Sequence, residues 1–432
     1  MTGANFLLDT GGAKFLVDCG LMQGRHTCEQ GNWEPFPYDP KTISYLIVTH
    51  THIDHIGRVP KLVREGFAGT ILSTPATKAL AGPLLRDAME LLTNEAQRCG
   101  KPPLYEEADI ERALSLWKGV DYHKSVELQD KVTLELYDSG HILGSAMAKF
   151  SRGGRSVVFT GDLGGGNSPL LPPPEPLPRA QYLIIESVYG DRTREDGSRR
   201  EELENIIEDT AARGGTLLIP AFSTERTQDL LFEIRTLMGE KRVPSMPVYL
   251  DSPLAREITS VFVEQLGRGN IFYFPELRFV AGVEESRKLA AAPNPKIILA
   301  GSGMSSGGRV LAHESVVLPD EKSTLLIVGY QAAGSLGRRL LEGAKKVELL
   351  GADGRGVSVQ VRARVSSVFG YSAHMDGEEL LEFINKGAGP LEQVFAVEGE
   401  PASASFLAQR ARDYLGVKTT APEGGEKSEI NF

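Results

Sequence analysis

Histidine and aspartate, two residue types that bind transition metals in proteins, are concentrated in one short segment of this sequence. Residues Tyr45 to His55 read Tyr-Leu-Ile-Val-Thr-His-Thr-His-Ile-Asp-His and hold three of the eight histidines in the 432-residue chain. The Leu-Ile-Val run is typical of a buried strand, so the polar residues begin where that strand ends. His50 and His52 point the same way in an extended backbone, whereas Asp54 can turn aside as the chain bends. One segment can thus supply ligands to two metal ions.

Imidazole and carboxylate groups suit zinc, and they suit manganese or iron where oxygen ligands are more numerous. The alternative is a histidine-rich loop that binds nothing, which is the better explanation for a single histidine. It does not explain three histidines and an aspartate gathered at one strand end. We therefore expect a transition-metal site here.

Other apolar runs along the chain also end in a side chain that can bind a metal or transfer a proton. These strand-end residues are His141, Asp162, Glu186, His374 and Glu398. Open α/β architectures gather their functional sites at the ends of strands. Asp18 closes a further predicted strand beside a glycine, and it fits two roles equally well. It either orients a ligand histidine through a hydrogen bond or binds its own backbone in a turn.

From about Asp191 the pattern of the sequence changes, because short apolar runs now alternate with segments of helical periodicity. This pattern predicts a second domain with a parallel sheet and crossover helices. Its strand ends are rich in glycine, as in Gly-Ser-Gly at 301–303 and Gly-Gly-Arg at 307–309. Backbone N–H groups and guanidinium groups suit phosphates, although each motif alone is also typical of an ordinary turn. We expect the phosphate contacts to come from Ser302, Arg309 and Arg338.

The composition is that of an ordinary globular protein with enough residues for two domains. The net charge of −10 argues against a large nonspecific nucleic-acid surface, but it leaves room for a local basic groove. No run reaches the roughly 18 apolar residues of a membrane span, and no signal-sequence pattern stands at the N-terminus. Cys19, Cys28 and Cys99 have no disulfide or zinc-finger spacing. We therefore expect a cytoplasmic protein that does not enter a membrane.

The order of these motifs resembles that of proteins with the metallo-β-lactamase fold, in particular its β-CASP branch. This branch contains nucleases such as RNase J and the endonuclease of the pre-mRNA cleavage and polyadenylation machinery. The His-Thr-His-Ile-Asp-His run is similar to the signature motif of the fold, and His141 and Asp162 are similar to its next two metal motifs. Three motifs special to the branch match Glu186, His374 and the segment around Glu398. The resemblance spans nearly the whole chain.

The resemblance implies an αββα sandwich with an inserted β-CASP domain built on a parallel α/β sheet. The first part of the metallo-β-lactamase domain would be 1–190, the β-CASP domain would be a cap over the site at 191–370, and 371–432 would be the C-terminal return. Relatives usually carry one more strand ahead of the position of Met1.

The resemblance also implies a set of metal ligands. They would be His50, His52 and His141 for one zinc, Asp54 and His55 for the other, and Asp162 as a bridge. Relatives usually carry a histidine where this chain has Glu398, and that histidine completes the shell of the second metal. Either the Glu398 carboxylate is a ligand, which favours harder metals such as Mn²⁺, or it points elsewhere and the second site is weak or vacant.

The implied activity is hydrolysis of RNA phosphodiester bonds with two zinc ions. His374 would be the general acid, Glu186 would orient its ring, and Asp54 would serve the reaction as a ligand. Whether the enzyme cuts within RNA or from an end is left open, as is a homodimer. Two alternatives are a small-substrate metallo-hydrolase of the same fold and a non-catalytic RNA-binding subunit.

Overall fold

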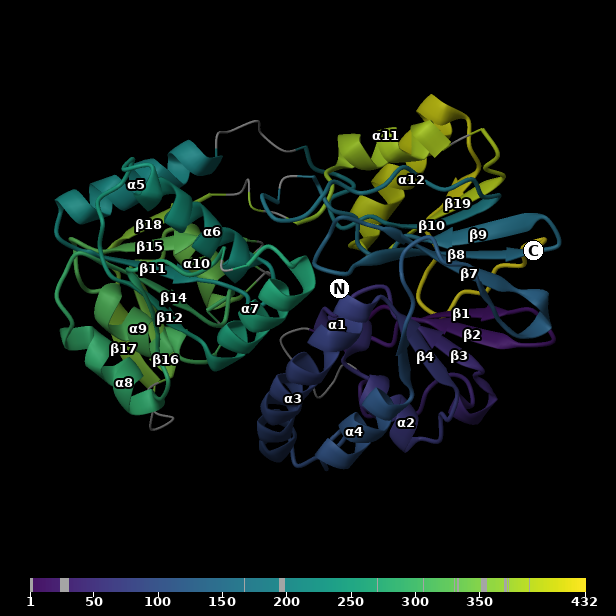
Figure 1. Ribbon diagram of the computed structural model, residues 1–432, viewed down its shortest axis with the longest axis horizontal. Coiled ribbons are helices and arrows are strands. Elements are labelled where there is room, and N and C mark those ends of the chain that lie inside the picture. Colours follow the sequence, from purple (N-terminus) through teal and green to yellow (C-terminus); the bar gives the residue numbers. More distant parts are fainter. Residues whose placement is uncertain are drawn as a thin grey trace. The chain divides into compact units, whose positions relative to one another are not determined.

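The protein is described from a computed structural model (Figure 1). The described residues are 3–23, 31–166, 168–193, 199–269, 271–305, 307–329, 331, 334–350, 356–368, 371, 373–387 and 389–432. The chain forms two compact units. Unit 1 comprises Met1–Gly166, Leu171–Arg194 and Ala373–Phe432, and unit 2 comprises Asn167–Leu170 and Glu195–Ser372. The predicted boundaries after residues 190 and 370 lie close to two of the points where the chain passes between the units.

Unit 1 contains a five-stranded sheet formed by the first part of the chain. Its strands follow the order β1 (Phe6–Asp9), β2 (Lys14–Val17), β3 (Tyr45–Ile47), β4 (Thr70–Ser73) and β5 (Trp117–Gly119). Only β1 and β2 are antiparallel, so β2 to β5 end at the same edge. The helices of this part are α1 (Ile53–Ile56), α2 (Val59–Arg64), α3 (Pro75–Arg98) and α4 (Glu107–Ser115).

A second sheet of unit 1 has seven strands from both ends of the sequence. Their order is β20 (Thr419–Thr420), β19 (Gln393–Val397), β10 (Tyr182–Glu186), β9 (Arg155–Phe159), β8 (Ala146–Arg152), β7 (Thr133–Asp138) and β6 (Val126–Glu127). The late strand β19 pairs in parallel with β10, next to β9. The carboxyl ends of these three strands therefore meet, although their residues are far apart in the sequence.

The two sheets pack face to face, because each has an apolar inner face. Phe15 of the first sheet lies 5.8 Å from Phe150 of the second, measured between ring centroids, and both are fully buried. The other face of the second sheet packs on α11 (Gly377–Gly387) and α12 (Pro401–Leu415), through buried residues such as Leu380 and Leu407. Figure 1 shows helices on the outer side of both sheets. The predicted αββα sandwich is confirmed.

Unit 2 is built on a six-stranded sheet in which every pairing is parallel. The order is β13 (Leu277–Phe279), β12 (Val248–Asp251), β14 (Lys296–Ala300), β11 (Thr216–Pro220), β15 (Thr324–Ile327) and β18 (Arg364–Ser367). Its helices are α5 (Arg199–Ala212), α6 (Arg226–Gly239), α7 (Pro253–Leu266), α8 (Val283–Lys288), α9 (Val310–Val317) and α10 (Leu336–Leu341), and β16 (Lys346–Leu350) and β17 (Gly356–Gln360) form a hairpin. The predicted parallel α/β sheet is confirmed.

Two further expectations concern the chain as a whole. None of the described helices has the length and apolar character needed to cross a membrane. Cys99 is disulfide-bonded, so the expectation that no cysteine pairs is wrong. Spacing along the sequence misled here, because cysteines pair according to their distance in the fold. Cys19 is free and buried, and Cys28 lies outside the described residues.

Candidate metal centre

The histidine segment follows β3 directly and ends in the short helix α1. His52 is the residue before that helix, and its extended backbone (φ −60°, ψ 146°) continues the strand direction from His50. Asp54 and His55 belong to the first turn of α1, so their side chains leave in other directions. The change from strand to helix inside five residues is what divides this segment between two groups of ligands.

Four side chains from three strand ends form the first group. They are His50, His52, His141 and Asp162, whose ligand atoms all lie within 4.8 Å of one another. The nitrogen His52 Nδ1 lies 3.1 Å from both His50 Nε2 and His141 Nε2. The oxygen Asp162 Oδ2 lies 3.4 Å from His50 Nε2 and 3.3 Å from His141 Nε2. These are the residues predicted for the first metal, with the predicted bridge.

The size of this group fits a zinc ion. Zinc bonds to histidine nitrogen at about 2.0–2.1 Å, so the edges of a tetrahedral zinc site are about 3.3 Å long. The four distances of 3.1–3.4 Å match that edge length. The other oxygen, Asp162 Oδ1, faces His55 Nε2 at 3.4 Å, is buried and has no hydrogen-bond partner among the described residues. A buried carboxylate oxygen without a donor is costly, and a cation would satisfy it.

The imidazoles of the first group are neutral. Burial lowers the pKa of His50, of His52 and of His141, and the nearby Asp162 carboxylate does not reverse that shift. For Asp162 itself, burial alone would raise the pKa, but nearby imidazoles, and most of all His55, hold it well below its usual range. Metal ligands must be deprotonated to bind. The group is therefore already in the protonation state that a metal requires.

His55 connects the first group to a second one. Its Nε2 lies 3.4 Å from Asp162 Oδ1, and its Nδ1 lies 2.8 Å from Asp18 Oδ2. Burial alone would lower the pKa of His55, but the Asp162 and Asp18 carboxylates outweigh it and raise the pKa well above the usual value. His55 Nε2 thus points toward Asp162 Oδ1, and a second metal bound between these two atoms would replace the proton on Nε2.

Asp18 orients His55 through the ring nitrogen Nδ1, which faces away from the metal centre. Both of its oxygens already accept hydrogen bonds, Oδ1 from Thr49 N at 2.8 Å and Oδ2 from Thr49 Oγ1 at 2.7 Å, and Oδ2 also faces His55 Nδ1. Although Asp18 lies within reach of a ligand set with His55 and Glu398, these bonds leave it little capacity for a metal. Of the two roles considered for Asp18, the geometry favours the one that fixes a ligand histidine.

Glu398 comes from the end of β19 and completes the second group. Its ligand oxygen lies within 4.8 Å of a ring nitrogen of His55 and of a carboxylate oxygen of Asp18. Its Oε2 is buried without a hydrogen-bond partner among the described residues. Burial raises the pKa of this carboxyl well above its usual range, so it holds a proton until a cation replaces it. Glu398, like Asp162, thus carries a buried carboxyl oxygen without a hydrogen-bond partner among the described residues.

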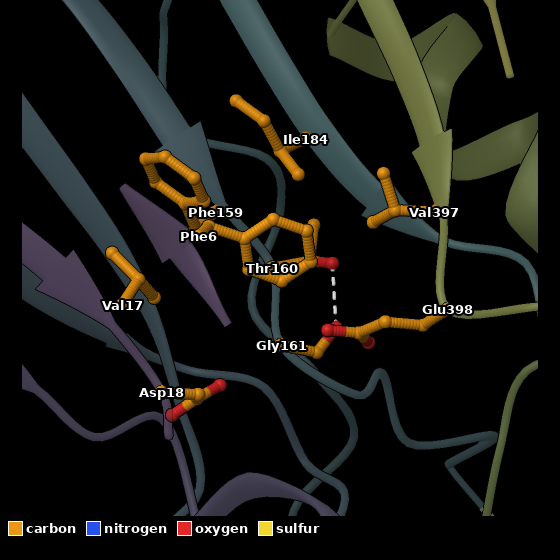
Figure 2. A pocket seen from close by; sticks show the side chains of 9 residues that line it. All are labelled: Phe6, Val17, Asp18, Phe159, Thr160, Gly161, Ile184, Val397 and Glu398. Atoms are coloured by element: carbon orange, nitrogen blue, oxygen red, sulfur yellow. Dashed lines mark hydrogen bonds between the residues drawn. The ribbon is translucent and has the colours of Figure 1, made fainter. Parts of the chain in front are cut away.

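Figure 2 shows Glu398 and Asp18 at the edge of a small pocket. The other lining residues are Phe6, Val17, Phe159, Thr160, Gly161, Ile184 and Val397. The pocket has no room for a water molecule, and the Thr160 hydroxyl donates to the Gly161 carbonyl at 2.6 Å (Figure 2). This hydroxyl therefore does not satisfy Glu398 Oε2.

Asp54 does not join the clusters of ligand atoms formed by the described residues. It is nevertheless close enough for its charge to favour the protonated forms of His52 and His374. Its predicted roles, as ligand of the second metal and as a residue of the reaction, stay predictions.

His374 lies beside Asp162, in a cluster with Glu186 whose ligand atoms lie within 4.8 Å of one another. Its Nδ1 lies 3.1 Å from Glu186 Oε1, and its Nε2 lies 3.9 Å from Asp162 Oδ2. Burial alone would lower the pKa of His374, but the Glu186 and Asp162 carboxylates outweigh it and raise the pKa to about 9. The His374 backbone also forms an antiparallel β-bridge with Gly164. The predicted pair of His374 and Glu186 is thus brought together beside the ligands.

The predicted phosphate contacts lie in unit 2. Ser302 follows β14, where a Cβ on Gly301 would lie 3.8 Å from Ser252 Oγ and 3.9 Å from Ser223 Oγ. Arg309 pairs with Asp251 at 2.6 Å, and its side chain is 22% exposed. Arg338 is on α10, 48% exposed, and pairs with Glu342 at 2.7 Å. Their roles stay predictions.

Thr49 and Tyr189 near the centre were not predicted. Thr49 donates to Asp18, and the Tyr189 ring lies 5.7 Å from the His374 ring. The only signal for Thr49 was its place beside His50, and for Tyr189 its place three residues after Glu186.

The fold and the centre define a metallo-hydrolase, and comparison with known families agrees. A model described as "Metallo-beta-lactamase superfamily" matches residues 3–244. The chain therefore belongs to this superfamily. Its branch is the β-CASP one, since the Beta-Casp domain model matches residues 227–340. A model described as "Zn-dependent metallo-hydrolase RNA specificity domain" matches residues 358–422.

Similar curated proteins carry names that concern RNA. "Ribonuclease TTHA0252" of Thermus thermophilus is 36% identical over 398 residues, which cover 89% of this chain and 88% of that protein. "Transcription termination factor FttA" of Methanosarcina mazei is 31% identical, covering 96% of this chain and 68% of that protein. A solved structure of a protein of unknown function from Enterococcus faecalis has a TM-score of 0.58 and is 13% identical in sequence. The match covers 98% of this chain and 96% of that chain, and it supports the fold.

Proposed function

We propose that this chain is a ribonuclease that hydrolyses RNA phosphodiester bonds with two metal ions, zinc at the first site. The observation that carries the proposal is the place of His374, an imidazole with a raised pKa, 3.9 Å from Asp162 and beside four possible ligands whose spacing fits a zinc ion. The ribonuclease named above supports RNA as the substrate. A non-catalytic RNA-binding subunit would need neither the ligand set nor the acid, and a small-substrate hydrolase would not need an RNA specificity domain.

Bound zinc would lower the pKa of a water molecule and stabilise negative charge on the phosphoryl oxygens. His50, His52, His141 and Asp162 would hold the first ion. His374, protonated at neutral pH, donates its proton to the departing oxygen. Glu186 Oε1 contacts His374 Nδ1, so the other ring nitrogen, Nε2, is the one that faces the substrate.

The pH dependence of cleavage should report this acid. His374 must be protonated to act, so the rate should fall as the pH rises through about 9. Replacing Glu186 by Gln removes the carboxylate that raises this pKa, so the alkaline limb of the pH–rate profile should move to lower pH. The measurement is kcat/KM on RNA from pH 6 to pH 10 for both proteins. A profile with the same alkaline limb in Glu186→Gln would contradict the assignment.

The second metal site is the part of the proposal that depends on Glu398. We propose that its carboxylate is a ligand together with His55 Nε2 and Asp162 Oδ1, which makes the site one oxygen richer than in relatives with histidine and favours Mn²⁺ more than a histidine site does. Glu398→His should therefore raise the affinity for a second zinc and move the acid limb of the pH–rate profile to lower pH. Zinc titration followed by calorimetry measures the first effect. Unchanged stoichiometry and pH dependence would show that Glu398 is not a ligand.

We also propose that Ser302, Arg309 and Arg338 contact RNA phosphates away from the bond that is cut. Gly301 has three serines near it, and hydroxyl and guanidinium groups suit phosphate oxygens. Arg338→Ala should weaken RNA binding and lower the dependence of log Kd on log salt by about one unit per lost contact. Arg242→Ala is a matched control, since Arg242 is 41% exposed and also pairs with a glutamate. Equal effects of both variants would refute a specific contact.

The place of the protein in the cell and its assembly stay predictions. The sequence leads us to expect a cytoplasmic location, and it leaves a homodimer open.

A further inference from the structure

The turn after β10 places an aromatic ring beside the candidate general acid. The ring of Tyr189 lies edge-on to the ring of His374, with 5.7 Å between centroids and 81° between planes. The guanidinium carbon of Arg192 lies 5.6 Å from the centre of the Tyr189 ring. The three side chains form a row from the partly buried His374 to Arg192, whose side chain is 50% exposed.

Main-chain hydrogen bonds hold this row in place. The Gly190 N–H donates to the Ser187 carbonyl at 3.1 Å, and the Arg192 N–H donates to the Tyr189 carbonyl at 3.0 Å. The Gly377 N–H at the start of α11 donates to the Arg192 carbonyl at 2.8 Å. A Cβ at Gly377 would lie 2.6 Å from the Gly190 oxygen, so the close approach requires glycine. A fixed turn loses little conformational entropy when a ligand binds to it.

The proposed reaction indicates which part of the RNA lies next to the Tyr189 ring. A general acid gives its proton to the leaving oxygen, so the leaving nucleotide must be on the His374 side of the scissile phosphate. Aromatic rings bind single-stranded RNA by stacking on its bases, and arginine binds its phosphates. Tyr189 is only half-buried, so its ring is not enclosed by the protein as a residue of the core would be.

We propose that Tyr189 and Arg192 form the binding site for the leaving nucleotide, with Tyr189 stacked on its base and Arg192 at the next phosphate. The inference rests on the proposed function, because it takes His374 to be the acid toward an RNA phosphodiester. If the inference holds, efficient cleavage requires a base on the leaving nucleotide, which the metal centre alone does not require.

A coupling experiment tests this inference. The substrate is a single-stranded RNA with a mapped cleavage position, prepared with and without the base of the leaving nucleotide. Loss of the base should lower kcat/KM of the unaltered enzyme by roughly 5- to 150-fold, the range for one stacked base. Tyr189→Ala should show a similar loss on intact RNA and little further loss on the abasic RNA. Tyr189→Phe keeps the ring and should stay close to the unaltered enzyme on both substrates.

Independent losses from the base and from Tyr189 would overturn the inference, since contacting groups are expected to be non-additive. Tyr414→Ala is the matched control, because Tyr414 is 71% exposed and Arg410 lies 5.5 Å from its ring centre. It should leave kcat/KM unchanged on both substrates.

Binding separates this inference from the proposed function. An RNA with 2-aminopurine at the leaving position should lose fluorescence when it stacks on Tyr189, whether or not it is cut. Quenching that depends on Tyr189 in a metal-loaded preparation that cleaves no RNA would refute the proposed function and keep only the stacking of a base on Tyr189. Cleavage with quenching that persists in Tyr189→Ala would refute the inference and keep the function.

Discussion

His374→Ala should cleave RNA roughly 10²–10⁴ times more slowly than the unaltered protein while it binds the same amount of metal. The variant loses the only described imidazole that contacts Glu186, and with it the proton for the leaving oxygen. It loses none of the four atoms that match a zinc site, because His374 Nε2 is 3.9 Å from Asp162 and outside that group. Single-turnover rates and metal analysis on the same preparation give both quantities.

His123→Ala is the control for this experiment. His123 also lies near a glutamate, with Nε2 3.2 Å from Glu175 Oε1, but its side chain is 57% exposed and it belongs to no ligand cluster among the described residues. Its cleavage rate should be unchanged. Loss of metal from His374→Ala would make His374 a ligand, and the role of general acid would then have to be given to another residue.

Asp162→Asn should have the second large effect, on metal content and on cleavage together. Asp162 is the residue whose two oxygens face both groups, Oδ2 toward His50 and His141 and Oδ1 toward His55. Asparagine keeps the shape and one oxygen but removes the charge. We expect metal affinity to fall by more than about 10²-fold, the upper end for changes outside the ligand shell, and cleavage to fall with it.

Zinc titration of Asp162→Asn measures this affinity, and circular dichroism shows whether the variant is folded. A folded variant with unchanged affinity for two metals would contradict the bridging role. A matched exposed change, Asp121→Asn, should leave both metal content and cleavage as they are, since Asp121 is 61% exposed and pairs only with Lys124 among the described ion pairs.

The sequence predicted the architecture well because apolar periodicity follows burial. The runs at 157–159 and 183–185 lie in β9 and β10, which are largely buried in the second sheet. The alternation of apolar runs and helical segments after Asp191 corresponds to the parallel sheet of unit 2. These features are local, so a single segment contains the information that determines them.

The contacts at the centre depend instead on residues that are distant in sequence. Asp18 meets His55 across 37 positions, and His374 meets Glu186 across 188. The resemblance to a known family supplied the second pair, whereas Asp18 was left with two roles. The contact of Arg309 with Asp251, 58 positions away, was likewise not predicted. The disulfide at Cys99 was missed for the same reason.

The most direct test is to incubate the purified protein with end-labelled single-stranded RNA before and after removal of metal with a chelator. We expect cleavage by the untreated protein, loss of cleavage after chelation, and its return when zinc or manganese is added back. The chelated protein must remain folded by circular dichroism. RNA that stays intact with metal-loaded protein, or that is cut equally well by folded, metal-free protein, would show that the protein is not a metal-dependent ribonuclease.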